Sequence, residues 1–118
     1  MESKQVITAL SALAQETRLA VFRLLVQAGP QGLAAGEIAT RLNCPAATLS
    51  FHLRELSQAG LVTATRQSRS IIYAADFAAM RNLLGFLTEN CCALSPDASC
   101  DLVPQGCGIP EKEKESLS

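Results

Sequence analysis

The most constraining feature of the chain is a leucine-striped segment that a glycine ends and two β-prone runs follow. Leu49, Leu53 and Leu56 recur at i, i+4 and i+7, a spacing that predicts the buried face of an α-helix. Pro45 is placed as an early residue of this helix, where its missing N–H is harmless. Gly60 supplies the left-handed residue on which such a helix ends.

The two runs after this helix predict a β-hairpin. Residues 61–65 and 70–74 are rich in β-branched side chains, and the polar segment between them is typical of a turn. We therefore expect two paired strands with Arg66 and Arg69 in the connecting turn.

Helical periodicity also precedes and follows this unit. We expect helices near residues 6–13, 16–27 and 36–42. The apolar positions that define the first two are Val6, Leu10, Leu13, Leu19, Phe22 and Val26. Asp76 is expected to cap a last helix with a seam of Phe77, Met80, Leu84 and Leu87, whose spacing is typical of paired helices. This order of elements predicts a mainly α fold with a small β-hairpin, the winged helix-turn-helix.

The charge distribution favours a nucleic-acid-binding domain followed by an acidic tail. The net charge is −1, but residues 1–96 hold all seven arginines and are net positive. We expect residues 111–118, which alternate Glu and Lys, to form a disordered tail. No signal-peptide pattern and no membrane-spanning run are visible, which predicts a cytoplasmic protein with reduced thiols and no membrane partner.

The face of the leucine-striped helix opposite its leucines is the predicted DNA contact. Short side chains would let the backbone approach DNA, the Phe51 ring suits a thymine methyl group, and Arg54 can reach a base or a phosphate. An ordinary solvated face and a charged hairpin tip are the alternative interpretation. We expect His52 to brace the helix or to meet a phosphate. The predicted DNA-binding residues are Ala47, Thr48, Ser50, Phe51, His52, Arg54, Arg66 and Arg69.

Two strings of residues carry a family resemblance. Residues 14–25, Ala-Gln-Glu-Thr-Arg-Leu-Ala-Val-Phe-Arg-Leu-Leu, resemble the second-helix signature of the ArsR/SmtB family of metal-responsive repressors. Residues 48–62, with Ser-Phe-His-Leu-Arg-Glu-Leu and then Ala-Gly-Leu-Val, resemble its recognition helix and exit. Glu16 departs from the pattern, since the family usually has Pro there. The resemblance implies a repressor that is homodimeric through its first and last helices and binds an inverted repeat in double-stranded DNA.

Two ligand sites familiar in that family are absent from this sequence. The third-helix site needs Cys-x-Cys, whereas residues 33–37 are Leu-Ala-Ala-Gly-Glu. The last-helix zinc site needs His and carboxylates, and residues 76–90 contain only Asp76 and Glu89 of these types. The chain instead resembles the arsenic-responsive members with a Cys-Cys pair after the last helix and another Cys downstream.

Four of the five cysteines lie in residues 91–107, where soft thiolates would select soft ions. Cys91 is expected to continue the helical seam, with Cys92 about 100° round the helix. The resemblance implies trivalent arsenic (or antimony, or methylarsenite) as inducer, bound by Cys91, Cys92 and Cys100, with no organic cofactor. Cys107 is the alternative third ligand, disfavoured because its roughly doubled loop costs about 0.6 kcal/mol more. The predicted division is residues 1–91 as DNA-binding and dimerisation domain, 92–110 as ligand segment and 111–118 as tail.

Other interpretations of the cysteines stay open. Cys107 could complete a four-sulfur zinc or cadmium site, which would make the protein a sensor of those metals. Two thiols could instead join in a disulfide or polysulfide, giving a redox-responsive repressor. A small thiol enzyme is disfavoured, because no anion-binding loop or base accompanies the cysteines, so we expect no enzymatic activity. Cys44 is expected to be a small buried hydrophobe.

Overall fold

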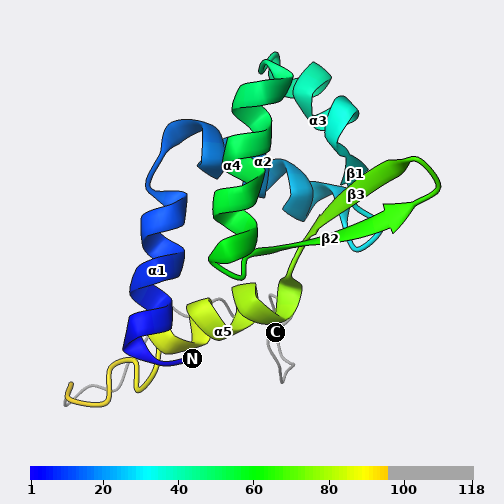
Figure 1. The fold of residues 1–118 in the computed structure, drawn as a ribbon. Helices are drawn as coiled ribbons and strands as arrows, with labels where there is room; N and C mark the ends of the chain where they lie inside the picture. Colours follow the sequence, from blue (N-terminus) through cyan, green and yellow to red (C-terminus); the bar gives the residue numbers. More distant parts are fainter. Residues whose placement is uncertain (96–118) are drawn as a thin grey trace. The chain divides into compact units, whose positions relative to one another are not determined.

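The computed structural model describes residues 1–95. Met1–Phe86 form one compact unit, and a second begins at Leu87. The elements are α1 (Ser3–Leu13), α2 (Glu16–Ala28), β1 (Leu33–Ala34), α3 (Ala35–Leu42), α4 (Ala46–Gln58), β2 (Val62–Gln67), β3 (Ser70–Ala75) and α5 (Phe77–Leu87) (Figure 1). Their order confirms the predicted winged helix-turn-helix and adds one strand.

The sheet has three antiparallel strands in the order β1-β3-β2, so the expected two-stranded hairpin gains a partner from the segment before α3. In the added pair, Leu33 lies opposite Tyr73 and Ala34 opposite Ile72. Gly32 precedes β1 with a left-handed φ of 68°, and a Cβ at this position would overlap the Tyr73 carbonyl oxygen. Glycine is therefore the residue that lets the backbone enter the sheet here.

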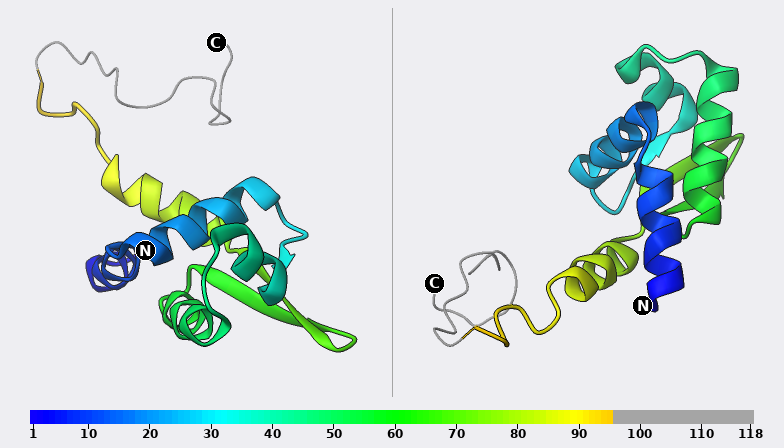
Figure 2. Two further views of the ribbon diagram at one scale, coloured as in Figure 1. Left: turned by 90° about the horizontal axis from the view of Figure 1, so that it is seen from above. Right: turned by 90° about the vertical axis from the view of Figure 1, so that its left-hand side faces the viewer.

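The hairpin is longer, and its turn tighter, than the sequence predicted. β2 extends to Gln67, which pairs with Ser70, so the turn consists of Ser68 and Arg69. Ser68 has a φ of 54°, and positive φ values are what two-residue hairpin turns require. Arg66 therefore lies within β2 and not in the turn. The left-hand view of Figure 2 shows the tip of the hairpin extending beyond the helices.

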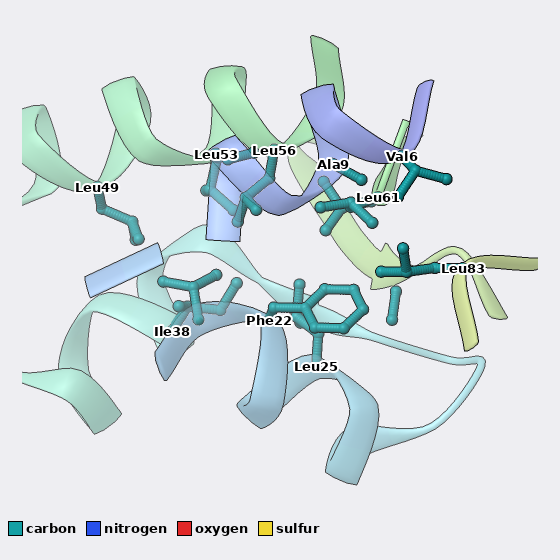
Figure 3. Packing of buried hydrophobic residues seen from close by; sticks show 14 residues of the cluster. Val6, Ala9, Phe22, Leu25, Ile38, Leu49, Leu53, Leu56, Leu61 and Leu83 are labelled. Atoms are coloured by element: carbon teal, nitrogen blue, oxygen red, sulfur yellow. The ribbon is translucent and has the colours of Figure 1, made fainter. Parts of the chain in front are cut away.

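The core confirms the predicted inward face of α4. Leu49, Leu53 and Leu56 are each at most 2% exposed. In Figure 3, side chains of α4 and Phe22 and Leu25 of α2 point into one interior. The other buried apolar residues are Val6, Ala9, Ala12, Val21, Ile38, Leu61, Val62, Ala75 and Leu83. The inner side of α4 is thereby fixed by elements on both sides of it in the sequence.

The buried rows of α1 and α2 differ from those that apolar spacing predicted. The inward residues are Val6, Ala9 and Ala12 in α1 and Val21, Phe22 and Leu25 in α2. Leu10 and Leu19, which belong to the predicted apolar stripes, are exposed in the single chain. The separation of packed helices depends on the side chains at their contact, so alanines let α1 lie close to its neighbours while its larger residues remain outside.

The two helices of the helix-turn-helix both end on left-handed residues. Asn43 ends α3 with φ 51° and ψ 49°, and Gly60 follows α4 with φ 80°. The next N–H donates back into the last turn at 3.0 Å in both cases, from Cys44 to the Ala39 carbonyl and from Leu61 to the Leu56 carbonyl. These are Schellman motifs, which confirm the turn at residues 43–44 and the stop at Gly60.

α4 begins one residue later than predicted. Pro45 is its N-cap, with φ −57° and an extended ψ of 143°, and is not an early helix residue. The proline still serves the helix, because its carbonyl accepts the Leu49 N–H at 2.9 Å.

α5 begins as predicted, but its apolar seam divides into two parts. The Asp76 carboxylate caps the helix by accepting the Ala79 N–H at 3.0 Å. Phe77 and Met80 pack against the core beside the buried Leu83, whereas Leu84 is 54% exposed. The second half of the predicted seam therefore lies outside the core of the single chain.

The helix does not continue to Cys91. It ends at Leu87 and is followed by turns, with positive φ at Asn90 and Cys92. The prediction that Cys91 continues the helical phase is wrong, because the helix ends at Leu87 and turns separate it from Cys91. No helix within residues 1–95 is long and apolar enough to span a bilayer.

Candidate nucleic-acid interface

The outer face of α4 is the best candidate for contact with a nucleic acid. Because the leucines occupy the inner side, the opposite residues are left in solvent. The exposed residues of this face are Ala47, Thr48, Ser50, Phe51 and Arg54. They include every predicted DNA-contacting residue of the helix except His52. Short side chains at its N-terminal end leave the backbone accessible to a groove.

Phe51 is the large apolar side chain of this face, and it is 48% exposed. Its ring lies against that of His52 in an edge-on arrangement, with centroids 5.5 Å apart and planes at 64°. An aromatic ring presented in this way can contact the thymine methyl group in the major groove.

His52 lies inside the protein and is 7% exposed. Its Nδ1 is 3.3 Å from Nη1 of Arg18, and the Nε of Arg18 donates to the Ala12 carbonyl at 2.7 Å. Of the two roles expected for His52, its burial fits bracing of the helix. The same guanidinium satisfies a carbonyl at the end of α1 that has no partner within that helix.

The hairpin adds two cations to this candidate surface. Arg66 and Arg69 are both exposed, as is Arg54 of α4. The salt bridge found within residues 1–95 joins Arg41 and Glu37 of α3 at 3.0 Å. In this part of the chain, no carboxylate therefore neutralises the three arginines of the candidate surface, and phosphates could do so.

Two of the predicted cysteine ligands, Cys91 and Cys92, are among the described residues. Within the segment that begins at Leu87, the Sγ atoms of Cys91 and Cys92 lie 3.6 Å apart. The other two predicted ligands, Cys100 and Cys107, lie outside the described residues. Among residues 1–95, no three His, Cys, Asp or Glu side chains converge as a metal site would require. Cys44 packs half-buried against the core, less completely than predicted.

Comparison with known proteins identifies the helix-turn-helix. Residues 13–64 match a family model described as a helix-turn-helix domain. An uncharacterized HTH-type transcriptional regulator of Bacillus subtilis (strain 168), YceK, is 37% identical over 59 residues, covering 50% of this chain and 58% of its own length. The chain thus matches less than two thirds of that relative.

Solved structures extend the similarity beyond the helix-turn-helix. An ArsR-like transcriptional regulator from Rhodococcus sp. RHA1 has a TM-score of 0.64 at 28% identity, over 71% of this chain and 76% of that one. Reduced HlyU from Vibrio cholerae N16961 has a TM-score of 0.58 at 31% identity, over 72% and 90%. The homodimeric winged helix-turn-helix DNA-binding domain of Mb0332 from Mycobacterium bovis, a possible ArsR-family transcriptional regulator, has a TM-score of 0.59 at 30% identity, over 74% and 81%. This chain belongs to the ArsR family of transcriptional regulators.

Membership of the ArsR family confirms the coarse prediction of a winged helix-turn-helix regulator that is not an enzyme. The structural roles of Arg18 and Gln15 in this ArsR-family chain were not predicted from the sequence. The Gln15 side chain caps α2 by accepting the Arg18 N–H at 2.8 Å. Both residues lie in residues 14–25, the segment that carries the family resemblance, but nothing in their spacing marks them as contact residues.

Proposed function

We propose that this ArsR-family regulator is a homodimeric repressor that binds an inverted-repeat operator through α4 and the β2–β3 hairpin. The observation that carries the proposal is the exposed face of α4. It combines short side chains, an outward Phe51 and Arg54, and no neutralising carboxylate within the described part of the chain. Arg66 and Arg69 on the hairpin are suited to the flanking phosphates, which position a protein on DNA without specifying sequence.

Homodimerisation is supported by large apolar side chains that are more than a third exposed in the single chain. Ile7 and Leu10 of α1 and Leu84 of α5 are 63%, 41% and 54% exposed. Large apolar side chains that gather into one exposed patch mark protein interfaces, and Ile7 and Leu10 lie one turn apart on α1. The Mb0332 domain, which shares this fold, is described as homodimeric. A two-fold dimer would place two copies of α4 on successive major grooves of an inverted repeat.

We further propose that trivalent arsenic, in the form of arsenite, is the inducer and that Cys91, Cys92 and Cys100 bind it. Methylarsenite and the antimony analogue antimonite are the alternative ligands. The support is chemical: thiolates select soft ions, and the Cys91 and Cys92 sulfurs lie 3.6 Å apart. Cys91 is disulfide-bonded in this structure, so it would bind the ion after reduction. Two sulfurs that share one ion must lie close together, as this pair does. Cys107 is the alternative third ligand.

The inducer must favour the DNA-free protein by the free energy that couples the two sites, typically about 1–3 kcal/mol, or about 5- to 150-fold in affinity. The test is fluorescence anisotropy with a duplex that the wild-type protein selects from a randomised pool, titrated with arsenite under excess reductant. We expect arsenite to weaken binding of the wild type and to leave Cys91→Ser and Cys92→Ser unaffected, while Cys44→Ser, the matched control, responds as the wild type does. Arsenite without effect, or with an equal effect on the tail variants, would refute the arsenic proposal.

A redox-responsive repressor is the second candidate, and two observations favour it. Cys91 is disulfide-bonded in this structure, and the similar HlyU structure is described as reduced. The reaction would convert two thiols and one hydrogen peroxide into a disulfide and two waters, so the protein is oxidised and the peroxide reduced. Operator release by peroxide, reversed by dithiothreitol and insensitive to arsenite in excess reductant, would establish this candidate over arsenic.

A further inference from the structure

A partly buried chain of polar contacts links the end of α1 to the recognition face of α4. Arg18 of α2 donates from Nε to the Ala12 carbonyl at 2.7 Å, and its Nη1 is 3.3 Å from Nδ1 of His52. Within residues 1–95, His52 is the buried polar side chain of the core. The chain therefore joins three helices through one guanidinium.

The Arg18 contact fixes how the His52 ring is held. A guanidinium is a donor only, so Nδ1 is the acceptor in its contact with Nη1. Turning the ring over would place a C–H edge against Nη1 and lose this partly buried hydrogen bond, which is costly. The imidazole is thus held in one orientation.

The oriented imidazole in turn contacts Phe51. The two rings meet edge-on, at 5.5 Å between centroids and 64° between planes, and half of the Phe51 side chain is exposed on the recognition face. Without this contact, the Phe51 ring would be free to move among the rotamers that a helix allows. A leucine could fill the same interior space without needing a polar partner, so filling space alone does not account for a buried histidine.

We propose that His52, oriented by Arg18, is a positioning residue for base discrimination, because it holds the Phe51 ring where it meets a thymine methyl group of the operator. This inference rests on the proposed operator binding. Arg18 and His52 touch no DNA; Phe51 makes the contact. One consequence is that discrimination depends on a bond between α2 and the carbonyl end of α1, remote from the DNA surface.

The test uses the full chain and a duplex that the wild type selects from a randomised pool. Each thymine is replaced in turn by deoxyuridine, which removes only the methyl group, and affinity is measured by fluorescence anisotropy. The wild type should lose about fourfold in affinity at one thymine of each half-site, the effect of exposing one buried methyl group. Phe51→Ala should bind the thymine and uracil duplexes equally.

Two substitutions of His52 separate positioning from stability. The Oδ1 of an asparagine occupies the place of Nδ1, so His52→Asn keeps an acceptor for Arg18 but removes the ring that contacts Phe51. We expect His52→Asn to melt near the wild type and His52→Leu to melt lower, with both losing the fourfold methyl effect. Ile38→Val, a core substitution away from the polar chain, should lower the melting temperature and keep the methyl effect.

The outcomes decide the inference either way. A methyl effect that persists in His52→Asn and His52→Leu but vanishes in Phe51→Ala would overturn the positioning role. Loss of the methyl effect in Ile38→Val would show that the effect depends only on the stability of the core, and this result would also overturn the positioning role. A wild type that enriches no duplex from the pool would refute the proposed operator binding and this inference together, whereas enrichment without any thymine sensitivity would refute the inference alone.

Discussion

At the scale of single residues, Gly32 is a position where the fold requires the absence of a side chain. Its left-handed φ of 68° and its close approach to the Tyr73 carbonyl let β1 join β3. A side chain there would combine backbone strain with a steric overlap. The added strand thus depends on a residue that lies outside it.

Gly32→Ala should therefore destabilise the protein by about 2 kcal/mol or more, since left-handed backbone alone costs an alanine about 1–2 kcal/mol. The measurement is urea unfolding followed by circular dichroism. Gly36→Ala is the matched control: Gly36 lies in α3, and a Cβ there meets no atom within 4 Å. This control should be neutral or stabilised by up to about 1 kcal/mol. Equal effects of the two substitutions would contradict the role given to Gly32.

At the scale of elements, the boundaries that local chemistry determines are the ones the sequence predicted well. The stop of α4 at Gly60 and the cap of α5 at Asp76 are both confirmed. β1 was missed because two residues, Leu33 and Ala34, show no periodicity. The end of α5 at Leu87 was missed because the next residues, Thr88 and Glu89, include no glycine or proline that would mark a helix end.

Asp76 gives a direct test of α5 as an element. Because its carboxylate accepts the Ala79 N–H at 3.0 Å, Asp76→Ala should lose about 1 kcal/mol of unfolding free energy. Asp76→Asn keeps a capping oxygen and should lose only a fraction of that. Chemical denaturation of the two variants side by side gives the comparison, and an alanine variant as stable as the asparagine one would rule out the cap as a stabilising contact.

The β2–β3 hairpin makes a prediction about salt. If Arg66 and Arg69 each neutralise one phosphate, replacing either with alanine should weaken binding to different duplexes almost uniformly. It should also make the slope of log affinity against log salt shallower by about 1. Arg41→Ala is the control, because Arg41 already pairs with Glu37. Anisotropy titrations over a range of salt concentrations measure the slopes, and unchanged slopes for both hairpin variants would remove the hairpin from the interface.

At the scale of the whole molecule, the exposed apolar side chains and the candidate DNA surface need different partners. The sequence predicted helical stripes on α1 and α5, and the single chain buries only part of each. Leu10 and Leu84 were assigned correctly as apolar positions of a stripe, but spacing alone cannot say whether a stripe packs within a chain or between chains. The same limit applies to the cysteines: proximity of Cys91 and Cys92 follows from adjacency, but their ligand does not.

Ile7→Glu and Leu84→Glu should each convert a dimer to a monomer while retaining helical content, because a buried unpaired carboxylate at an interface is costly and one in solvent is not. Analytical ultracentrifugation gives the assembly state. Ile71→Glu, on the exposed face of the hairpin, is the matched control and should remain dimeric. Dimers of unchanged affinity for both helix variants would show that the interface lies elsewhere.

The paired left-handed stops at Asn43 and Gly60 have a practical consequence for retargeting. The left-handed residues set where α4 begins and ends, and the buried leucines hold the helix against the core. Its outward side chains therefore contribute little to the position of the helix. Ala47, Ser50 and Arg54 can therefore be substituted without disturbing the position of the helix. New base preferences could be installed by exchanging these three side chains, leaving the rest of the protein as it is.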